Sequence, residues 1–177
     1  MVTGVKSSEL KEMEKKRMQF NKIKKLMSIL LCITMIFVVV GCSKEEKKET
    51  AVTKEQIDSF VSQSIESDGF KDELAFVDEE KALDQYGITK EEIESITAYL
   101  GTGASAEELV CIKTKDTDKI KSLMTQHLEE QKKNFESYLP DEVPKIESAL
   151  VEVKGDYVIV CVADKIDTIK KLQSDNL

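Results

Sequence analysis

Apolar positions along the chain follow two periods, one typical of helices and the other typical of strands. The first helical segment begins after Thr53, which forms a capping-box pattern with Gln56, and it ends at Asp68-Gly69. Its apolar positions are Ile57, Phe60, Val61 and Ile65. This spacing predicts a helix with one apolar face.

The middle of the chain predicts a second short helix and then a β-hairpin. A short apolar piece at 74–77 precedes a helical stretch at 78–86, which a glycine can end. Residues 93–100 alternate like a strand, and residues 107–114 form the returning strand. The glycine-containing segment 101–106 is the predicted turn.

The last part of the chain predicts a long helix, a second hairpin and a final helix. The long helix is capped by Asp116 or Thr117 and must stop near a proline. Its apolar line is Ile120, Leu123, Met124, His127, Leu128, Phe135 and Tyr138. Strands at 146–153 and 157–162 flank a turn, and Asp164 can cap the last helix.

The order of these elements is helix, helix, strand, strand, helix, strand, strand, helix. Two hairpins in such an order predict an antiparallel four-stranded sheet, and we expect the helices to pack on one face of it. The predicted fold class is therefore α+β, in a single domain at 53–177.

A basic and then apolar segment precedes this domain. Residues 26–40 form an apolar run of 15 residues, and Val39-Val40-Gly41-Cys42 has the form of a lipobox. As a helix the run would span roughly 22 Å, short of the ~30 Å hydrocarbon core of a membrane. A signal peptide therefore fits better than an uncleaved transmembrane anchor or a soluble core helix.

The chain is predicted to divide into a signal peptide, a lipidated charged tether and one domain, at 1–41, 42–52 and 53–177. Residues 1–17 are long and mixed in charge for a signal peptide, so Met1 and Met18 both stay open as the translation start. Two acyl chains on Cys42 would anchor the protein stably. We therefore expect the domain at the extracytoplasmic face of a Gram-positive-type cell membrane.

Charge excludes one class of partner. Residues 1–41 hold 8 of the 26 basic and 3 of the 34 acidic side chains, so residues 42–177 hold 18 and 31, a formal charge of −13. These residues include no arginine. Phosphate contacts need clustered Lys and Arg, so we expect no nucleic-acid partner.

The cysteines and the single histidine argue against a cofactor or zinc site. Only Cys111 and Cys161 remain after the signal peptide and the lipidated cysteine, and they lie in two predicted strands. They would pack as small buried thiols, or they would form a disulfide if their strands are adjacent and the compartment is oxidising. No CxxC spacing is present, so we expect neither metal nor cofactor.

Catalytic chemistry has weak support in the sequence. His127 is the one candidate base, and its place on the apolar line of a helix is typical of a core or edge histidine. Adjacent carboxylates such as Glu107 and Glu108 point in different directions on a strand and are interpreted as surface charge. We therefore expect no enzyme activity.

Recognition is the remaining chemistry. The small side chains of one loop would let a partner backbone or a ligand approach closely, although a plain hairpin connection gives the same pattern. The residues of this possible contact loop are Gly101, Thr102, Gly103, Ala104 and Ser105. Tyr99, Tyr138 and Tyr157 would form an amphipathic patch if they gathered at one end of the sheet, but Tyr138 is expected to close the core.

Several short motifs occur in a fixed order along the domain: Tyr86-Gly87-Ile88, Ala98-Tyr99, residues 103–108, Phe135-Glu136-Ser137-Tyr138-Leu139-Pro140, and Gly155-Asp156-Tyr157-Val158 with Asp164. Together with the lipobox, this set resembles the bacterial lipoprotein family called domain of unknown function 4358, over about residues 70 to 175. The resemblance implies a surface lipoprotein and transfers no catalytic residue.

The expected function is that of a membrane-anchored binding or accessory module of a cell-envelope protein complex. The alternative is a lipoprotein that binds a small molecule or a cation. A single domain of this length has no second lobe to close around a solute, which weighs against the alternative.

Overall fold

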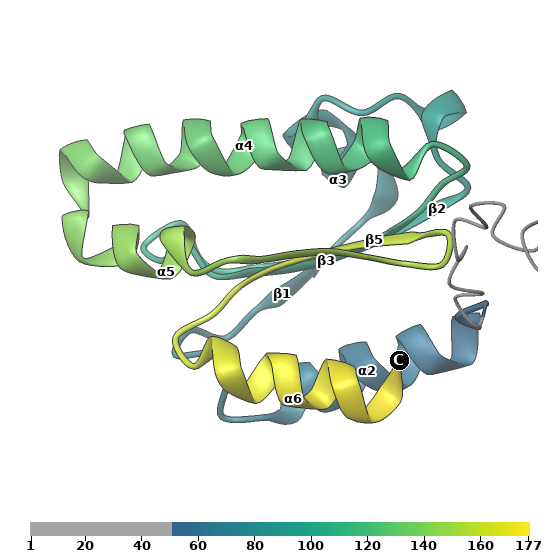
Figure 1. The fold of residues 1–177 in the computed structure, drawn as a ribbon. Coiled ribbons are helices and arrows are strands. Elements are labelled where there is room, and N and C mark those ends of the chain that lie inside the picture. The colour runs from purple at the N-terminus through teal and green to yellow at the C-terminus, as the bar shows by residue number, and fades with distance from the viewer. Residues whose placement is uncertain (1–50) are drawn as a thin grey trace, which may run out of the picture. The chain divides into compact units, whose positions relative to one another are not determined.

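The computed structural model describes residues 51–177. These residues form five α-helices and a five-stranded sheet (Figure 1). The helices are α2 (Lys54–Glu66), α3 (Glu79–Tyr86), α4 (Thr117–Tyr138), α5 (Val143–Glu147) and α6 (Ile166–Asn176). The strands are β1 (Ala75–Val77), β2 (Ser95–Leu100), β3 (Glu108–Lys113), β4 (Leu150–Lys154) and β5 (Tyr157–Val162), and two short 3₁₀ helices are η1 (Lys90–Glu92) and η2 (Pro140–Glu142).

The sheet is antiparallel throughout, in the order β1-β2-β3-β5-β4. Both predicted hairpins are confirmed, and the pairing of β3 with β5 joins them. The prediction of four strands misses β1, which pairs with β2 at the sheet edge. Three residues are too few to show an alternating pattern, so periodicity did not identify this strand.

Helices cover both faces of the sheet, so the prediction of helices on one face is wrong (Figure 1). One core lies between the sheet and α3, α4 and α5, and a second core lies between the sheet and α2 and α6. The reason lies in β5, where every residue is buried. A strand that is apolar on both faces needs a layer on each side, and the continuous run Val158-Ile159-Val160-Cys161-Val162 is such a strand.

Most helix ends agree with the sequence prediction. Thr53 and Gln56 form the capping box of α2, and Asp116 caps α4. Gly87 ends α3 in the left-handed conformation at φ 63°, which glycine adopts without a Cβ clash. The N-cap of α6 is Lys165, one residue after the predicted Asp164.

The second predicted hairpin begins later than the sequence indicated. Ile146 lies in α5, and β4 starts at Leu150. Pro144 occupies the first turn of α5, where the missing N–H of a proline costs no helical hydrogen bond. The short helix was therefore hidden by a proline and by the apolar residues that continue into the strand.

Cys111 and Cys161 are free thiols buried in the second core, which confirms the prediction of packed thiols. Cys111 pairs with Ile159 and Cys161 with Leu109, so the two cysteines are diagonal neighbours. Diagonal pairs lie about 7–8 Å apart, and a disulfide needs roughly 4.4–6.8 Å between Cα atoms. Burial raises the pKa of Cys111 to about 12 and also raises that of Cys161.

The signal peptide, the lipobox and the lipidated Cys42 lie outside the described residues. Val52, predicted as part of the tether, is buried in the second core. Residues 51–177 belong to one compact unit, and both of its cores are built from its own side chains. Across 51–177, no helix has the length and apolar character needed to cross a membrane.

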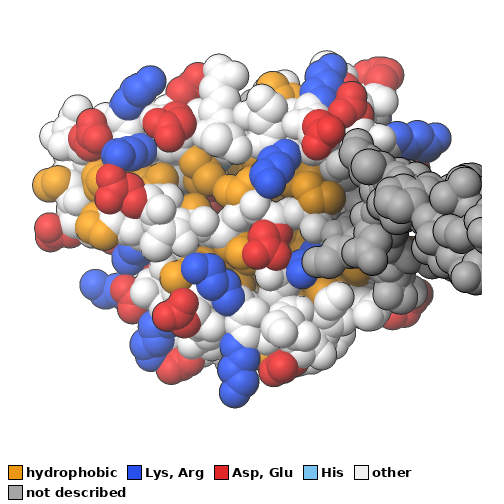
Figure 2. Space-filling model, in the orientation of Figure 1, with side chains coloured by type: hydrophobic (Ala, Val, Ile, Leu, Met, Phe, Trp, Pro, Cys, Tyr) orange, Lys and Arg blue, Asp and Glu red, His pale blue; other side chains and the backbone are white. Residues whose placement is uncertain are grey.

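The surface carries interspersed acidic and basic side chains (Figure 2). On the face shown, hydrophobic side chains gather in a band between the two helical layers. The edge strand β4 contributes half-buried Val151 and Val153 to the first core. Mixed charge of this kind is typical of a soluble surface.

Candidate functional site

A cavity of about 390 Å³ opens between the β2–β3 turn and α4. The turn and the start of β3 form one wall, and α4 forms the other with the end of α3. Its lining residues are Gln85, Leu100, Gly101, Gly103, Ser105, Glu107, Glu108, His127, Glu130, Gln131, Asn134, Phe135 and Tyr138. Small-molecule sites have volumes of roughly 300–1,000 Å³, so this cavity has room for a small ligand.

A buried carboxylate, that of Glu108, lies at the cavity wall with an exposed fraction of 2%. The hydroxyl of Tyr86 donates to Glu108 Oε2 over 3.0 Å. His127 Nε2 lies 3.3 Å from the same oxygen, and an ionised carboxylate only accepts, so Nε2–H is the donor. The two donors come from α3 and α4, and therefore tie both helices to the start of β3.

Strand alternation explains why Glu108 faces these helices. Glu108, Val110 and Ile112 lie on one face of β3, and the two apolar residues belong to the core beneath α4. Tyr86 and His127 make an edge-to-face contact with ring centroids 4.8 Å apart. Burial, the charge of Glu108 and the hydrogen bond to it all raise the pKa of Tyr86, so this phenol stays a donor.

Two oxygens of this site accept no hydrogen bond. Glu108 Oε1 lies 3.3 Å from His127 Nε2 but receives no hydrogen bond, and it is shielded from bulk water. Gln131 Oε1 is also shielded and has no partner, while its Nε2 donates to Ala106 O over 3.5 Å. Both residues line the cavity. Unpaired buried acceptors are rare in folded proteins, so each needs an explanation.

Glu107 points to the other side of the strand and fixes the neighbouring loop. It is buried, and its Oε2 accepts the backbone N–H groups of Lys71 over 2.9 Å and Asp72 over 2.8 Å. Its Oε1 lies 3.1 Å from Lys145 Nζ. This carboxylate therefore connects the segment before β1 to α5.

The turn itself is held by carboxylates on both sides. Asp72 Oδ2 accepts from the backbone N–H of Thr102 over 2.8 Å and from its hydroxyl over 2.9 Å. Glu142 Oε2 accepts from Ala106 N over 3.0 Å and from Ser105 Oγ over 3.3 Å. The turn is thus positioned beside the cavity by side-chain hydrogen bonds from other parts of the domain.

A family model described as "Domain of unknown function (DUF4358)" matches residues 66–163. The chain belongs to this DUF4358 family. The matched segment contains all the residues that line the cavity, and the match confirms the domain family that the sequence motifs resemble. Neither the curated proteins nor the solved structures include a match to this chain.

Within the DUF4358 domain, the predicted contact loop lies between two hollows. Gly101, Gly103 and Ser105 line the large cavity. Thr102 and Ala104 line a smaller hollow of about 200 Å³, which Ser105 shares. The loop therefore forms the wall between the two hollows.

The three tyrosines of the predicted patch do not gather. Tyr99 and Tyr157 contact the second core, at opposite ends of their strands. Tyr138 ends α4 on the other side of the sheet and is 56% exposed, so the prediction that it closes the core is wrong. The first core closes instead with Phe135 and Leu139, and Tyr138 is left at the cavity.

Sequence reasoning missed the importance of Glu108. The interpretation of Glu107 and Glu108 as surface charge is wrong, because both are buried. Their place at the start of the apolar strand 109–112 was the available signal. His127, with a side chain 14% exposed, is the edge histidine that its position on the helix predicted.

The chemistry available at this site is that of hydrogen bonding and charge. Within the described residues, no group of three or more His, Cys, Asp and Glu side chains is arranged to hold a metal ion. The cavity instead offers three carboxylates, three carboxamides, an imidazole and two aromatic rings. Such a set suits the recognition of a polar ligand with an apolar part.

Proposed function

We propose that this DUF4358 protein is a lipid-anchored binding or accessory module of a cell-envelope protein complex, with the cavity as its recognition site. The observation that carries the proposal is the cavity of about 390 Å³ beside a turn of small residues, with the buried carboxylate of Glu108 in its wall. A turn of small residues next to a polar cavity lets a partner approach the backbone closely.

The proposed location at the membrane rests on the sequence of the predicted signal peptide. The apolar run of 15 residues and the lipobox that ends at Cys42 support cleavage and lipidation. Two acyl chains on Cys42 would hold residues 53–177 at the extracytoplasmic face of the membrane.

Side-chain pairing at the cavity supports binding rather than catalysis. Acyl transfer needs a nucleophile within hydrogen-bond reach of a base. Among the described side chains, His127 is hydrogen-bonded to Glu108, and the Ser105 hydroxyl donates to Glu142 instead. The pairing leaves His127 in the role of a donor to a carboxylate.

The alternative function is that of a lipoprotein that binds a small molecule or a cation. The volume of the cavity and the unpaired Oε1 of Glu108 favour this alternative. A single domain suffices for it, because the cavity is formed by the turn and α4 without a second lobe.

In-cell photo-crosslinking tests the proposal. A photoreactive amino acid replaces Glu130, an exposed residue of the cavity wall, and in the matched control it replaces exposed Glu129 of the same helix, which does not line the cavity. We expect capture of one transporter, secretion or wall-synthesis component from position 130, weak capture from 129, and loss of capture in Cys42→Ala.

Two outcomes would change the conclusion. Membrane retention without capture from position 130 would favour the small-ligand alternative. A Cys42→Ala chain that is normally processed, lacks lipid and still sediments with membranes would contradict the proposed anchor.

A further inference from the structure

Two buried acceptors beside the cavity lack donors. Glu108 Oε1 and Gln131 Oε1 are buried polar atoms without hydrogen-bond partners, and both residues line the cavity. An unpaired buried acceptor costs about 1–3 kcal/mol, and more when it is charged. A ligand that donates hydrogen bonds would remove this cost, so the missing partner is a donor.

The charge of the cavity wall defines the ligand further. The lining residues include Glu107, Glu108 and Glu130 but no lysine or arginine. Glu107 is paired with Lys145 outside the cavity wall. The carboxylates of Glu108 and Glu130 therefore leave a negative cavity, which attracts a cation and disfavours an anion.

Two aromatic rings lie at the same cavity. Phe135 and Tyr138 have ring centroids 5.0 Å apart and are tilted by 32°. Tyr138 is 56% exposed, which is unusual for a large apolar side chain of this domain. Aromatic faces attract organic cations and cover the carbon body of a ligand.

We propose that this cavity binds a small organic ammonium compound, whose carbon body lies against Tyr138 and whose N–H groups donate to Glu108 Oε1 when the Glu108 side chain turns this oxygen, closed to water in the free domain, toward the cavity. The inference rests on the proposed binding function of the same site and names its ligand class. A primary ammonium carries three N–H donors, as a lysine head group does. A quaternary ammonium has none and would leave Glu108 Oε1 unpaired.

A metal ion fits the same cavity less well. Hard cations such as Mg²⁺ and Ca²⁺ take six to eight oxygen ligands, and the described residues lack even a group of three suitable side chains. The apolar surface of Tyr138 also gives a bare ion no contact. An amine of the size of an amino sugar or an amino alcohol uses both the acceptors and the ring.

Binding can be measured on residues 48–177, because the described residues 51–177 belong to one compact unit with two cores of its own. The ¹⁵N-labelled domain is titrated with D-glucosamine, with D-glucose as the matched neutral probe, and with choline chloride and MgCl₂. We expect saturable shifts of the backbone amides of 101–108 and of His127 with glucosamine, at least about tenfold weaker binding of choline, and no saturable response to glucose.

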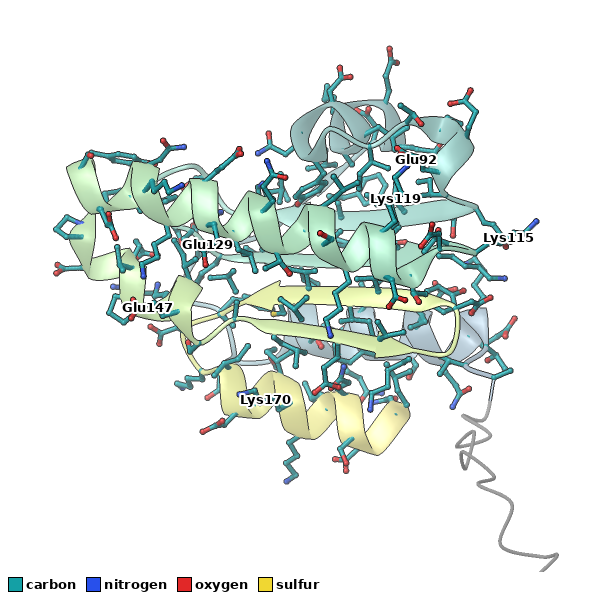
Figure 3. The ribbon with its side chains drawn as sticks, turned by 45° about the horizontal axis from the view of Figure 1, so that its top comes forward. Glu92, Lys115, Lys119, Glu129, Glu147 and Lys170 are labelled. Atoms are coloured by element: carbon teal, nitrogen blue, oxygen red, sulfur yellow. The ribbon has the colours of Figure 1, made fainter. Side chains whose placement is uncertain are left out.

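The variant Glu108→Gln tests the carboxylate, and Glu129→Gln is its matched control. Glu129 lies on the same helix as His127 (Figure 3) but is exposed and does not line the cavity. We expect Glu108→Gln to weaken glucosamine binding by about tenfold or more, since a hydrogen bond to a charged group contributes about 1.5–3 kcal/mol. Glu129→Gln should change it by less than about twofold.

A second variant covers the case in which Glu108→Gln fails to fold. Tyr138 is exposed, so Tyr138→Ala should leave the amide spectrum dispersed and weaken glucosamine binding by about threefold to tenfold. Equal responses to glucosamine and glucose, saturable binding of MgCl₂ in preference to glucosamine, or no site-localised shift with any amine would overturn the inference. Capture of an envelope protein from position 130 alongside such a result would leave the proposed function standing.

Discussion

The buried ion pair of Glu107 gives the sharpest stability prediction. The substitution Glu107→Gln removes one negative charge and keeps the shape of the side chain. In the native domain this carboxylate is buried, and it faces the N–H groups of Lys71 and Asp72 and the ammonium of Lys145. A glutamine retains one carbonyl oxygen for the two backbone donors.

The expected loss follows from these contacts. The ionic contact to Lys145 disappears, and a hydrogen bond to a charged group contributes about 1.5–3 kcal/mol. Lys145 keeps Glu142 at 3.1 Å, so its charge is not left alone, and the loss stays below the roughly 3–5 kcal/mol of a fully broken buried pair. We expect the free energy of unfolding to fall by about 2–3 kcal/mol.

Urea denaturation of residues 48–177 at pH 7 measures this change, provided that the m value is the same in both proteins. Glu147→Gln is the matched control, because Glu147 on the surface pairs with Lys132 over 2.6 Å with a side chain 54% exposed (Figure 3). It should lose less than about 0.5 kcal/mol. A loss of that small size for Glu107→Gln as well would refute the argument that burial makes this pair important.

Two further predictions concern thiols and acid. Cys111 and Cys161 are free, buried thiols, so a reductant should leave the melting temperature unchanged. Burial also raises the pKa of both thiols, so alkylation should proceed only on unfolding. A loss of stability of about 2–4 kcal/mol on reduction would instead indicate a disulfide. Burial opposes ionisation of Glu142, but hydrogen bonds from Ala106 N–H and Lys145 hold its pKa below the usual 4.5. The folded pKa of Glu142 lies below the unfolded one, so this stabilisation is complete above about pH 5 and is lost as pH falls through the folded pKa. Between pH 6 and pH 3, the melting temperature of Glu142→Gln should therefore fall less than that of the unchanged protein. An identical fall in both proteins would contradict the stabilising role of the Glu142 carboxylate.

Much of the local structure was predictable because its causes are local. The Thr53–Gln56 capping box begins α2, and Asp116 begins α4, as the sequence indicated. Both hairpins follow from pairs of strand-like apolar segments separated by turn residues. Such features depend on residues a few positions apart, so a single sequence contains the information.

The sheet edge and the second helical layer were harder to predict. β1 has three residues and exists because β2 offers an edge to pair with. Both faces of β5 are buried, which requires helices on both sides of the sheet. Because apolar and polar residues do not alternate in β5, its sequence does not show which helix covers which face.

The sequence by itself determined the family, the order of most elements and the residue types of the contact loop. The tertiary structure decided which side chains meet at the cavity. Glu108 lies 22 positions from Tyr86 and 19 from His127, and its burial depends on the packing of α3 and α4 over β3. Contacts between distant segments arise from that packing, and no local pattern around Glu108 records the partners that it finds there.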